Sequence, residues 1–278
     1  MPREPRSELK TFRLVIAYKG TDYQGWQKQA VQDGPPTVQE MIEAAARLVL
    51  KQEKFSFHGS GRTDSGVHAR GQVAHLRANV DLPAAVLIKA INAHLPEDIR
   101  ILKMDSVDAD FHAQIDVKSK TYRYFILNTH TGKDPVHWPF LRPYTWFVTY
   151  PLNYEKMRTA LGYLEGTHDF RSFQNRGTPM PDTVREILQA KLLDHSGDPS
   201  EIPPWMPSAD FQAKLLEVRV QGTGFLKQMV RTIVGTIVEV GRGRIPPEKI
   251  LEILAQKDRK ASGMTAPARG LFLDRVDY

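Results

Sequence analysis

The strongest constraint on the fold is a pair of long strand-like segments that follow one another with no helix between them. They are TVREILQAKLLD (183–194) and DFQAKLLEVRV (210–220), and the stretch that joins them, HSGDPSEIPPWMPSA (195–209), contains four prolines. Parallel neighbours usually need a helical crossover, whereas antiparallel neighbours need only a loop. The pair is therefore expected to be antiparallel, with the proline-rich stretch as an insertion at the hairpin tip.

The segments before this pair mix strand and helix patterns, but not in strict strand–helix–strand order. Thr37 and Glu40 have the spacing of a capping box, which predicts where the first helix begins. Apolar residues then recur at helical spacing along the same segment. The expected elements of this half are strands over 12–20, 72–78, 99–107 and 120–128, and helices over 37–52 and 83–96.

A stretch rich in turn-forming residues divides the chain into two halves of similar style. It covers residues 129–143 and contains Gly132 and three prolines. The expected domains are 1–128, a linker over 129–143, and 144–278 with the insertion at about 195–209. The second domain is expected to hold strands over 144–148, 183–194, 210–220 and 270–278, and helices over 153–166, 224–241 and 246–258.

Together these elements predict an α+β fold of two pseudo-symmetric lobes. Each lobe is expected to be a mainly antiparallel sheet with helices on one face. A cleft between two such lobes is a natural place for a functional site.

Composition narrows the classes of function. The chain has no cysteine, which excludes disulfides, thiol nucleophiles and cysteine-based metal sites. A cytoplasmic location is expected, because the first ten residues lack the apolar core of a signal peptide. No apolar run approaches the roughly 18 residues of a membrane span. The formal net charge of +6 and the pI of about 9.4 favour a polyanionic partner, most often nucleic acid.

The loop FHGSGRTDSGVHARG (57–71) concentrates glycine, charge and histidine. Its glycines permit positive φ and close backbone approach. Asp64 is a short carboxylate that a rigid turn would hold, and Arg62, Arg70 and Arg231 are candidates to keep it ionised. A fixed, ionised aspartate can serve as a nucleophile or a general base. A structural Asx-turn with solvated arginines is the alternative.

Other motifs carry less information. No GKS or GKT follows a glycine-rich loop, so the chain has no P-loop. The set His58, His68 and His75 lacks the spacing of a known metal motif, so we expect no metal. The His168–Asp169 doublet is too common to indicate a metal-dependent hydrolase.

Two aromatic segments leave alternatives open. In the expected strand KTYRYF (120–125), Tyr122 and Tyr124 share one face, and Arg123 and Phe125 share the other. Aromatic side chains beside arginines suit an unstacked base, and a core tyrosine is the alternative. The segment YKGTDYQGWQ (18–27) could be a tight turn with its aromatic residues in the core, or a base-stacking element.

The chain resembles the TruA family of tRNA pseudouridine synthases. The GRTDSGVHA string is highly specific, and the matching segments follow the family order over nearly the whole chain. They are YKGTDYQGWQ (18–27), TVQE (37–40), GSGRTDSGVHARGQV (59–73), NAHLPEDI (92–99), DFHA (110–113), KTYRY (120–124), GTHDFRSF (166–173), GFLKQMVRTIVG (224–235) and GLFLDRVDY (270–278).

The resemblance implies isomerisation of uridine to pseudouridine in the tRNA anticodon stem-loop, typically at positions 38, 39 and 40. It implies two lobes around a basic cleft, a homodimer that holds the RNA, and neither a cofactor nor a metal. By match, Asp64 is the catalytic aspartate and Arg62 helps to extrude the target base. Tyr122 matches the tyrosine that stacks on uracil, and Arg231 matches the arginine that pairs with the aspartate.

The chain departs from the family pattern at a few positions. Lys19 stands where an acidic residue is common, and Gln114 stands where arginine is usual, which puts one expected RNA or structural contact in doubt. Two other classes compete with the resemblance. A non-catalytic tRNA-binding protein would share the charge and the aromatic residues but would not need Asp64. A metal-dependent hydrolase of nucleic acids would use the histidines and lose activity in EDTA.

Overall fold

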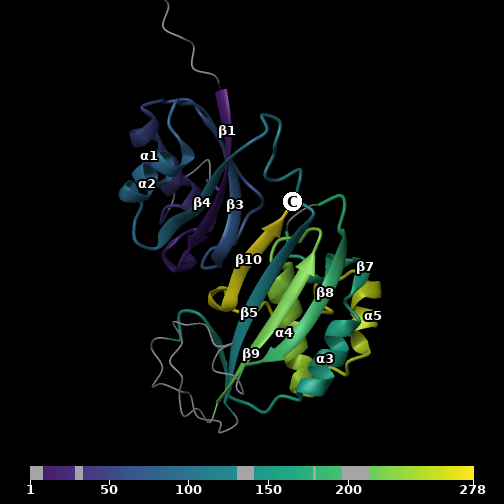
Figure 1. Cartoon of the computed structure of the whole chain (residues 1–278). Helices are drawn as coiled ribbons and strands as arrows, with labels where there is room; N and C mark the ends of the chain where they lie inside the picture. The colour runs from purple at the N-terminus through teal and green to yellow at the C-terminus, as the bar shows by residue number, and fades with distance from the viewer. Residues whose placement is uncertain (1–8, 29–33, 130–140, 178–179, 196–212) are drawn as a thin grey trace, which may run out of the picture. The chain divides into compact units, whose positions relative to one another are not determined.

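A computed structural model describes residues 9–28, 34–129, 141–177, 180–195 and 213–278 (Figure 1). The chain forms two compact units. Residues 1–118 and 273–278 make up the first unit, and residues 119–272 make up the second. The linker expected at 129–143 and the insertion expected at about 195–209 fall mostly outside the described residues, so the predicted domain boundaries stay a prediction.

Where the structure describes it, the first unit is an antiparallel sheet with two α-helices. Its strand order is β4–β1–β3, and β2 also pairs with β3. The helix α2 contacts β4, and α1 contacts α2. The elements are β1 (Leu9–Tyr18), α1 (Val38–Leu50), β2 (Ser56–Gly59), β3 (His68–Asn79), α2 (Ala84–His94) and β4 (Ile99–Val107).

Local signals explain these elements well. Along β1, Phe12, Leu14 and Ile16 are each at most 1% exposed, which is the alternation of a strand that buries one face. The capping box at α1 is confirmed, because the Thr37 hydroxyl accepts from the Glu40 amide while the Glu40 carboxylate accepts from the Thr37 amide. The predicted start of that helix is therefore correct.

In its described residues, the second unit combines a mixed sheet with three α-helices, which gather against its strands in Figure 1. The strand order β5–β9–β8–β7 is antiparallel, and β6 pairs with β5 in parallel. The elements are β5 (Ser119–Thr129), β6 (Trp146–Val148), α3 (Tyr154–Gly162), β7 (Gly166–Asp169), β8 (Val184–Asp194), β9 (Ala213–Gly222), α4 (Met229–Gly241) and α5 (Lys249–Gln256). The last strand, β10 (Leu271–Asp277), begins in this unit and ends in the first unit. The α+β class and the antiparallel pairing of β8 with β9 are confirmed.

Several predicted boundaries are wrong, and three of them are displaced by four residues or more. The helix expected over 153–166 ends at Gly162. The helix expected over 224–241 begins at Met229, because Gln228 adopts a left-handed conformation with φ of 60° and interrupts the helical path. Phe225, which falls within the expected range, therefore lies outside the helix. The strand expected over 72–78 begins at His68. No helix within the described ranges is long and apolar enough to cross a membrane.

A buried charged cluster stabilises the second unit. The Glu217 carboxylate is fully buried and accepts hydrogen bonds from Arg123 (2.6 Å) and Arg219 (2.6 Å), and it lies 2.8 Å from Nε2 of His195. Burial alone would raise the pKa of Glu217, but the bonds from His195, Arg123 and Arg219 outweigh it and lower this pKa to about 2. The folded unit therefore holds Glu217 as a carboxylate.

This cluster predicts acid sensitivity. A carboxyl group whose pKa is lowered by folding stabilises the protein above its unfolded pKa, and the contribution is lost as the pH falls toward the folded pKa. For Glu217, whose pKa falls from 4.5 to about 2, the contribution is on the order of 3 kcal/mol. We expect the free energy of unfolding to decline from pH 5 to pH 2 by this amount more in the wild type than in Glu217→Gln, as measured by chemical denaturation.

The matched control for this prediction is Glu155→Gln. Glu155 pairs with Arg158 on the surface, and its side chain is 83% exposed, so its removal should leave the pH dependence unchanged. Parallel stability curves for the wild type and Glu217→Gln would contradict the assignment.

Candidate active-site loop and its supports

The loop between β2 and β3 presents Arg62 and Asp64 on the first unit. Arg62 is exposed and Asp64 is partly buried, whereas Thr63 between them is only 7% exposed. The chain therefore turns the side chain of Thr63 toward the core of the unit. The two charged residues flank this inward-facing residue.

A tight turn fixes the backbone directly after the aspartate. The Val67 amide donates to the Asp64 carbonyl at 3.1 Å, which closes a four-residue turn. Gly66 is the third residue of that turn and has φ of 76°. This is the position where a type II turn requires a positive φ and favours glycine. The glycine of the DSG segment is thus explained by backbone geometry.

The segment 18–27 supports the loop through backbone and side-chain hydrogen bonds to Thr63. The Trp26 amide donates to the Thr63 carbonyl at 3.1 Å, and the Tyr18 hydroxyl shares a 2.7 Å hydrogen bond with the Thr63 hydroxyl. Gly25 has φ of 86°, and a Cβ atom there would lie 2.4 Å from the Thr63 carbonyl oxygen. The two backbones therefore pack so closely that only glycine fits at residue 25.

Further contacts hold the loop on both sides of Thr63. The buried Gln72 accepts from the Ser60 hydroxyl at 2.8 Å and donates to the Gly61 carbonyl at 2.9 Å. On the other side, the Ser65 hydroxyl donates to the Tyr23 carbonyl at 3.1 Å. Each residue from Gly61 to Ser65 is therefore itself anchored or adjoins an anchored residue.

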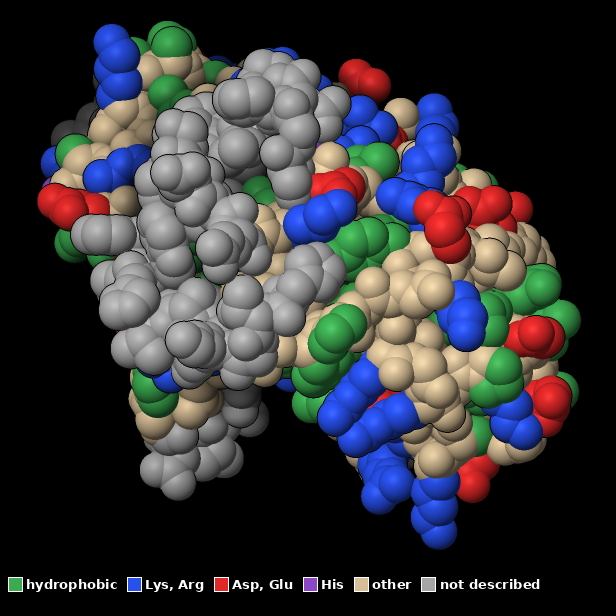
Figure 2. Space-filling view, turned by 90° about the horizontal axis from the view of Figure 1, so that it is seen from below, with side chains coloured by type: hydrophobic (Ala, Val, Ile, Leu, Met, Phe, Trp, Pro, Cys, Tyr) green, Lys and Arg blue, Asp and Glu red, His purple; other side chains and the backbone are tan. Residues whose placement is uncertain are grey.

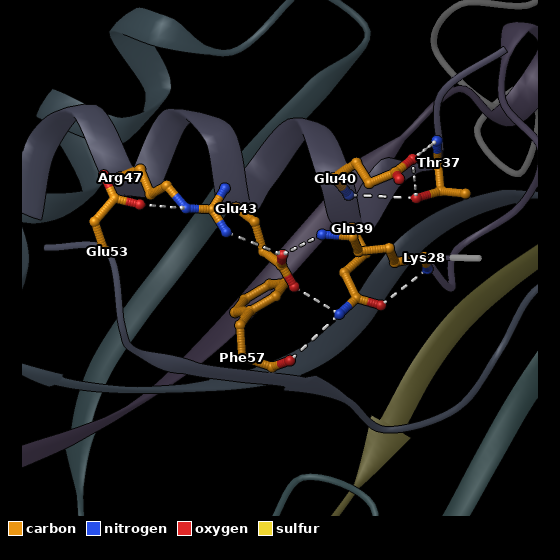
Figure 3. Close-up of polar contacts among 8 residues, drawn as sticks. All are labelled: Lys28, Thr37, Gln39, Glu40, Glu43, Arg47, Glu53 and Phe57. Carbon is orange, nitrogen blue, oxygen red and sulfur yellow. Dashed lines mark hydrogen bonds and ion pairs between the residues drawn. The ribbon is translucent and has the colours of Figure 1, made fainter. Parts of the chain in front are cut away.

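Helix α1 holds the supporting segment in turn (Figure 3). The first amides of a helix have no partner within the helix, and here the Val38 and Gln39 amides donate to the carbonyls of Gly25 (3.1 Å) and Trp26 (3.0 Å). The Gln39 side chain accepts from the Lys28 amide at 3.2 Å and donates to Glu43 at 2.7 Å. The TVQE motif thus has a structural role in supporting the loop.

The burial of its aromatic residues decides between the two alternatives for the segment 18–27, a tight turn in the core or a base-stacking element. Tyr23 is 6% exposed and Trp26 is 1% exposed. The Tyr23 hydroxyl donates to Asp98 at 2.6 Å. Both aromatic residues are therefore core residues that shape the support of the loop, as the first of the two alternatives expected.

The second unit carries the other two residues singled out by the resemblance. Tyr122 lies on β5, is 8% exposed, and packs its ring edge-on against Phe225 with ring centroids 5.1 Å apart. Arg231 lies in the first turn of α4, where its Nε donates to the Ala266 carbonyl at 2.8 Å. The Ala266 amide donates back to the Arg231 carbonyl at 3.0 Å. The Arg231 side chain is thus oriented by its bond to Ala266, while the backbone bond ties the same two residues together.

The other candidate residues have structural partners. Arg70, considered as a charge partner of Asp64, forms an ion pair with Asp274 at 3.0 Å. The ring nitrogens Nδ1 of His68 and His75 accept from backbone amides. Among the described residues, no group of three or more His, Asp or Glu side chains is arranged to hold a metal ion.

Comparison with known proteins decides the family. Residues 14–116 and 160–278 match the family model described as tRNA pseudouridine synthase. This chain is also 42% identical to tRNA pseudouridine synthase A of Bacillus pumilus over 96% of its own length and 98% of that protein. The chain belongs to the TruA family of tRNA pseudouridine synthases. Members of this family are isomerases.

Other relatives agree with the assignment to TruA. The chain is 37% identical to tRNA pseudouridine synthase A of Thermoanaerobacter sp. strain X514, over 97% of this chain and 100% of that protein. Among solved structures, it aligns with a chain of a Cbf5–Nop10–Gar1 complex at 12% identity and a TM-score of 0.35, over 94% of this chain and 48% of that one. A structural similarity this low supports no conclusion about this chain.

Lys120 is a residue of this TruA chain that the sequence did not single out. It lies on β5 two residues before Tyr122, so the two side chains share one face of the strand. Burial lowers the pKa of Lys120 to about 8. A local sequence pattern gives no signal for this shift, because it depends on what the fold packs around the ammonium group.

The charges on the face shown in Figure 2 are unevenly mixed. Several Lys and Arg side chains gather at the lower edge of this view, and elsewhere they lie next to Asp and Glu side chains. Ion pairs such as Arg13 with Asp105 (3.2 Å) show the same mixing in the first unit. The basic cleft that the TruA resemblance implies stays a prediction.

Proposed function

We propose that this TruA-family chain converts uridine to pseudouridine in the anticodon stem-loop of tRNA, at positions 38, 39 and 40, with Asp64 as the catalytic group. The observation that carries the proposal is the anchored loop in which Asp64 lies. A catalytic carboxylate must be held within a fraction of an ångström of its target. The neighbours of Asp64 are fixed by Tyr18, Trp26 and a glycine-dependent turn.

The reaction breaks the bond from ribose C1′ to uracil N1, turns the base and rejoins it through C5. Nothing is oxidised or reduced, so no redox cofactor is needed. A base stacked in an RNA helix cannot be reached, and flipping it out costs a few kcal/mol. In the proposed mechanism, Asp64 acts on the flipped nucleotide, either by attack on C1′ or by removal of the C2′ proton. Phosphate contacts from Lys and Arg offset the cost of flipping.

The other three residues have complementary proposed roles. The exposed guanidinium of Arg62, two residues before the aspartate, occupies the space that the flipped base vacates. Tyr122 stacks on the detached uracil, which keeps the rejoining step effectively intramolecular. Arg231 pairs with Asp64. We also propose that two copies of the chain assemble to hold one tRNA, which measurement of the molecular mass in solution tests.

Tritium release tests this proposal. Purified protein is incubated with tRNA that carries tritium at uridine C5, because rejoining through C5 releases that label. We expect several turnovers per protein molecule, unchanged by EDTA. A non-catalytic tRNA-binding protein would bind the tRNA and release no label, and a metal-dependent hydrolase would cleave the RNA and stop in EDTA. Either outcome would contradict the proposal.

Substitutions at Tyr122 test the stacking role. Tyr122→Phe keeps the ring and is expected to retain kcat within about 10-fold, whereas Tyr122→Ala is expected to lose about 100-fold or more, because stacking on a base is worth about 1–3 kcal/mol and the rotating base loses its support. The rates are measured by tritium release. Equal and severe losses in both variants would indicate a proton-transfer role for the hydroxyl instead.

A stability control accompanies the Tyr122 variants. The ring also packs against Phe225, so Tyr122→Ala loses packing within the second unit. Phe225→Leu weakens the same packing without removing the tyrosine. If its loss of activity matches that of Tyr122→Ala, then packing rather than stacking explains the effect.

A further inference from the structure

Thr63 is the residue through which the core of the first unit reaches the candidate active-site loop. It is the immediate neighbour of both Arg62 and Asp64, and it is 7% exposed. Its carbonyl oxygen accepts from Trp26, and its hydroxyl is bonded to Tyr18 at 2.7 Å. Thr63 is thus held through both its backbone and its side chain, on the side of the chain opposite to its charged neighbours.

Tyr18 is well suited to hold this residue in place. It is the last residue of β1, it is 4% exposed, and its ring packs against the ring of Trp26 with centroids 5.9 Å apart. The register of β1 against β3 shifts between Ile16 and Tyr18. Register shifts of this kind, called β-bulges, change the direction of a side chain and are common next to active sites. Here the shift lies at the end of β1, where the Tyr18 hydroxyl bonds with Thr63 of the loop.

The two hydroxyls are buried and bonded to each other, and the Tyr18 hydroxyl also interacts with Gln72. Burial raises the pKa of Tyr18 well above its usual range, although the bonds with Thr63 and Gln72 act in the opposite direction. The phenol is therefore neutral and protonated at physiological pH. Removal of one hydroxyl would leave the other buried with a lost partner, whereas removal of both leaves no such group.

We propose that the Tyr18–Thr63 hydrogen bond positions Asp64 for the isomerisation, so that Tyr18 is a positioning residue of the reaction although its hydroxyl lies in the core. The inference rests on the proposed function, in which Asp64 is the catalytic group. The bond fixes the χ1 angle of Thr63, and the backbone of Thr63 directly precedes that of Asp64. A loop without this bond keeps its fold but samples more than one placement of the carboxylate.

The test is a double-variant cycle built from Tyr18→Phe and Thr63→Val. Both substitutions keep the shape of the side chain and remove only a hydroxyl group. We expect each single variant to lower kcat for 5-tritiated tRNA by about 10- to 100-fold, with KM within about 2-fold of the wild type. We expect each to lower the melting temperature by about 2–10 °C, because one buried hydroxyl loses its partner.

The double variant separates positioning from stability. It has no unpartnered hydroxyl from this pair, so its melting temperature should recover at least half of the loss. Its kcat should stay as low as that of the single variants, because the bond is still absent. Thr63→Ser keeps the hydroxyl and should retain kcat within about 3-fold of the wild type. Recovery of kcat together with the melting temperature in the double variant would overturn the proposal.

Two controls keep this outcome distinct from failure of the proposed function. Tyr154→Phe removes a tyrosine hydroxyl that donates to Asn128 at 2.8 Å in the second unit, and it should lower stability without lowering kcat. Asp64→Asn reports on the proposed function itself. If Asp64→Asn is inactive while Tyr18→Phe has the kcat of the wild type, the positioning role is wrong and the proposed function stands. If Asp64→Asn keeps the wild-type rate, the proposed function fails first.

Discussion

Replacement of Asp64 by asparagine is expected to lower kcat by at least about 10⁴-fold, while the protein stays folded and binds tRNA. The substitution keeps the size of the side chain but removes the carboxylate that attacks C1′ or takes the C2′ proton. Losses of this size follow removal of a group that reacts directly with the substrate, and 10⁴-fold corresponds to about 5 kcal/mol of transition-state stabilisation. Single-turnover tritium release measures the rate, and filter binding measures the affinity for tRNA.

Asp81→Asn is the matched control for this variant. Asp81 belongs to the same unit, and its side chain is 90% exposed and paired with Lys10 at 3.0 Å. It should have the activity of the wild type. A wild-type rate in Asp64→Asn, or an equal loss in both variants, would contradict the assignment of Asp64.

The second large effect is expected at Gly25, which packs against the backbone of Thr63 and Asp64. In Gly25→Ala the new Cβ would lie 2.4 Å from the Thr63 carbonyl oxygen, and alanine would have to adopt φ of 86°. The conformation alone costs about 1–2 kcal/mol, and the contact forces the backbones of the two loops apart. Since a shift of about 1 Å at an active site can cost about 100-fold in rate, we expect at least that loss in kcat.

The variant Gly243→Ala separates the cost of the positive φ from the effect of the close contact with Thr63. Gly243 has φ of 80°, but a Cβ atom there would meet nothing within 4 Å. This variant should lose a similar conformational free energy in chemical denaturation and keep the kcat of the wild type. If Gly25→Ala behaves like Gly243→Ala in both measurements, the close packing against Thr63 does not position the loop.

Local signals in the sequence predicted much of the fold. The capping box at Thr37 and Glu40 depends on residues three apart, so the sequence alone locates the start of α1. The start of α4 was misplaced because Gln228 adopts a left-handed conformation that glycine or asparagine would have signalled and glutamine does not. The early start of β3 was missed for a similar reason, because strand pairing is set by partners distant in the chain.

In the candidate site, too, some features follow from the local sequence and others depend on tertiary contacts. Asp64 and Arg62 are proposed from the sequence because the GRTDSGVHA string is specific, and Gly66 is explained by a turn of four residues. The supports of the loop were not predicted. Tyr18 and Gly25 come from a segment about forty residues earlier, and their spatial closeness to Thr63 is a tertiary contact that no periodicity encodes. The shifted pKa of Lys120 likewise depends on burial.

The proposed function is tested most directly by mapping pseudouridine in tRNA from a strain that lacks this protein. Three strains are compared: the deletion strain, the same strain complemented with the wild-type chain, and the same strain complemented with Asp64→Asn at equal protein level. We predict that pseudouridine at positions 38, 39 and 40 is absent from the deletion strain, returns with the wild type and stays absent with Asp64→Asn. Unchanged pseudouridine at these positions in the deletion strain, or its return with Asp64→Asn, would contradict the account.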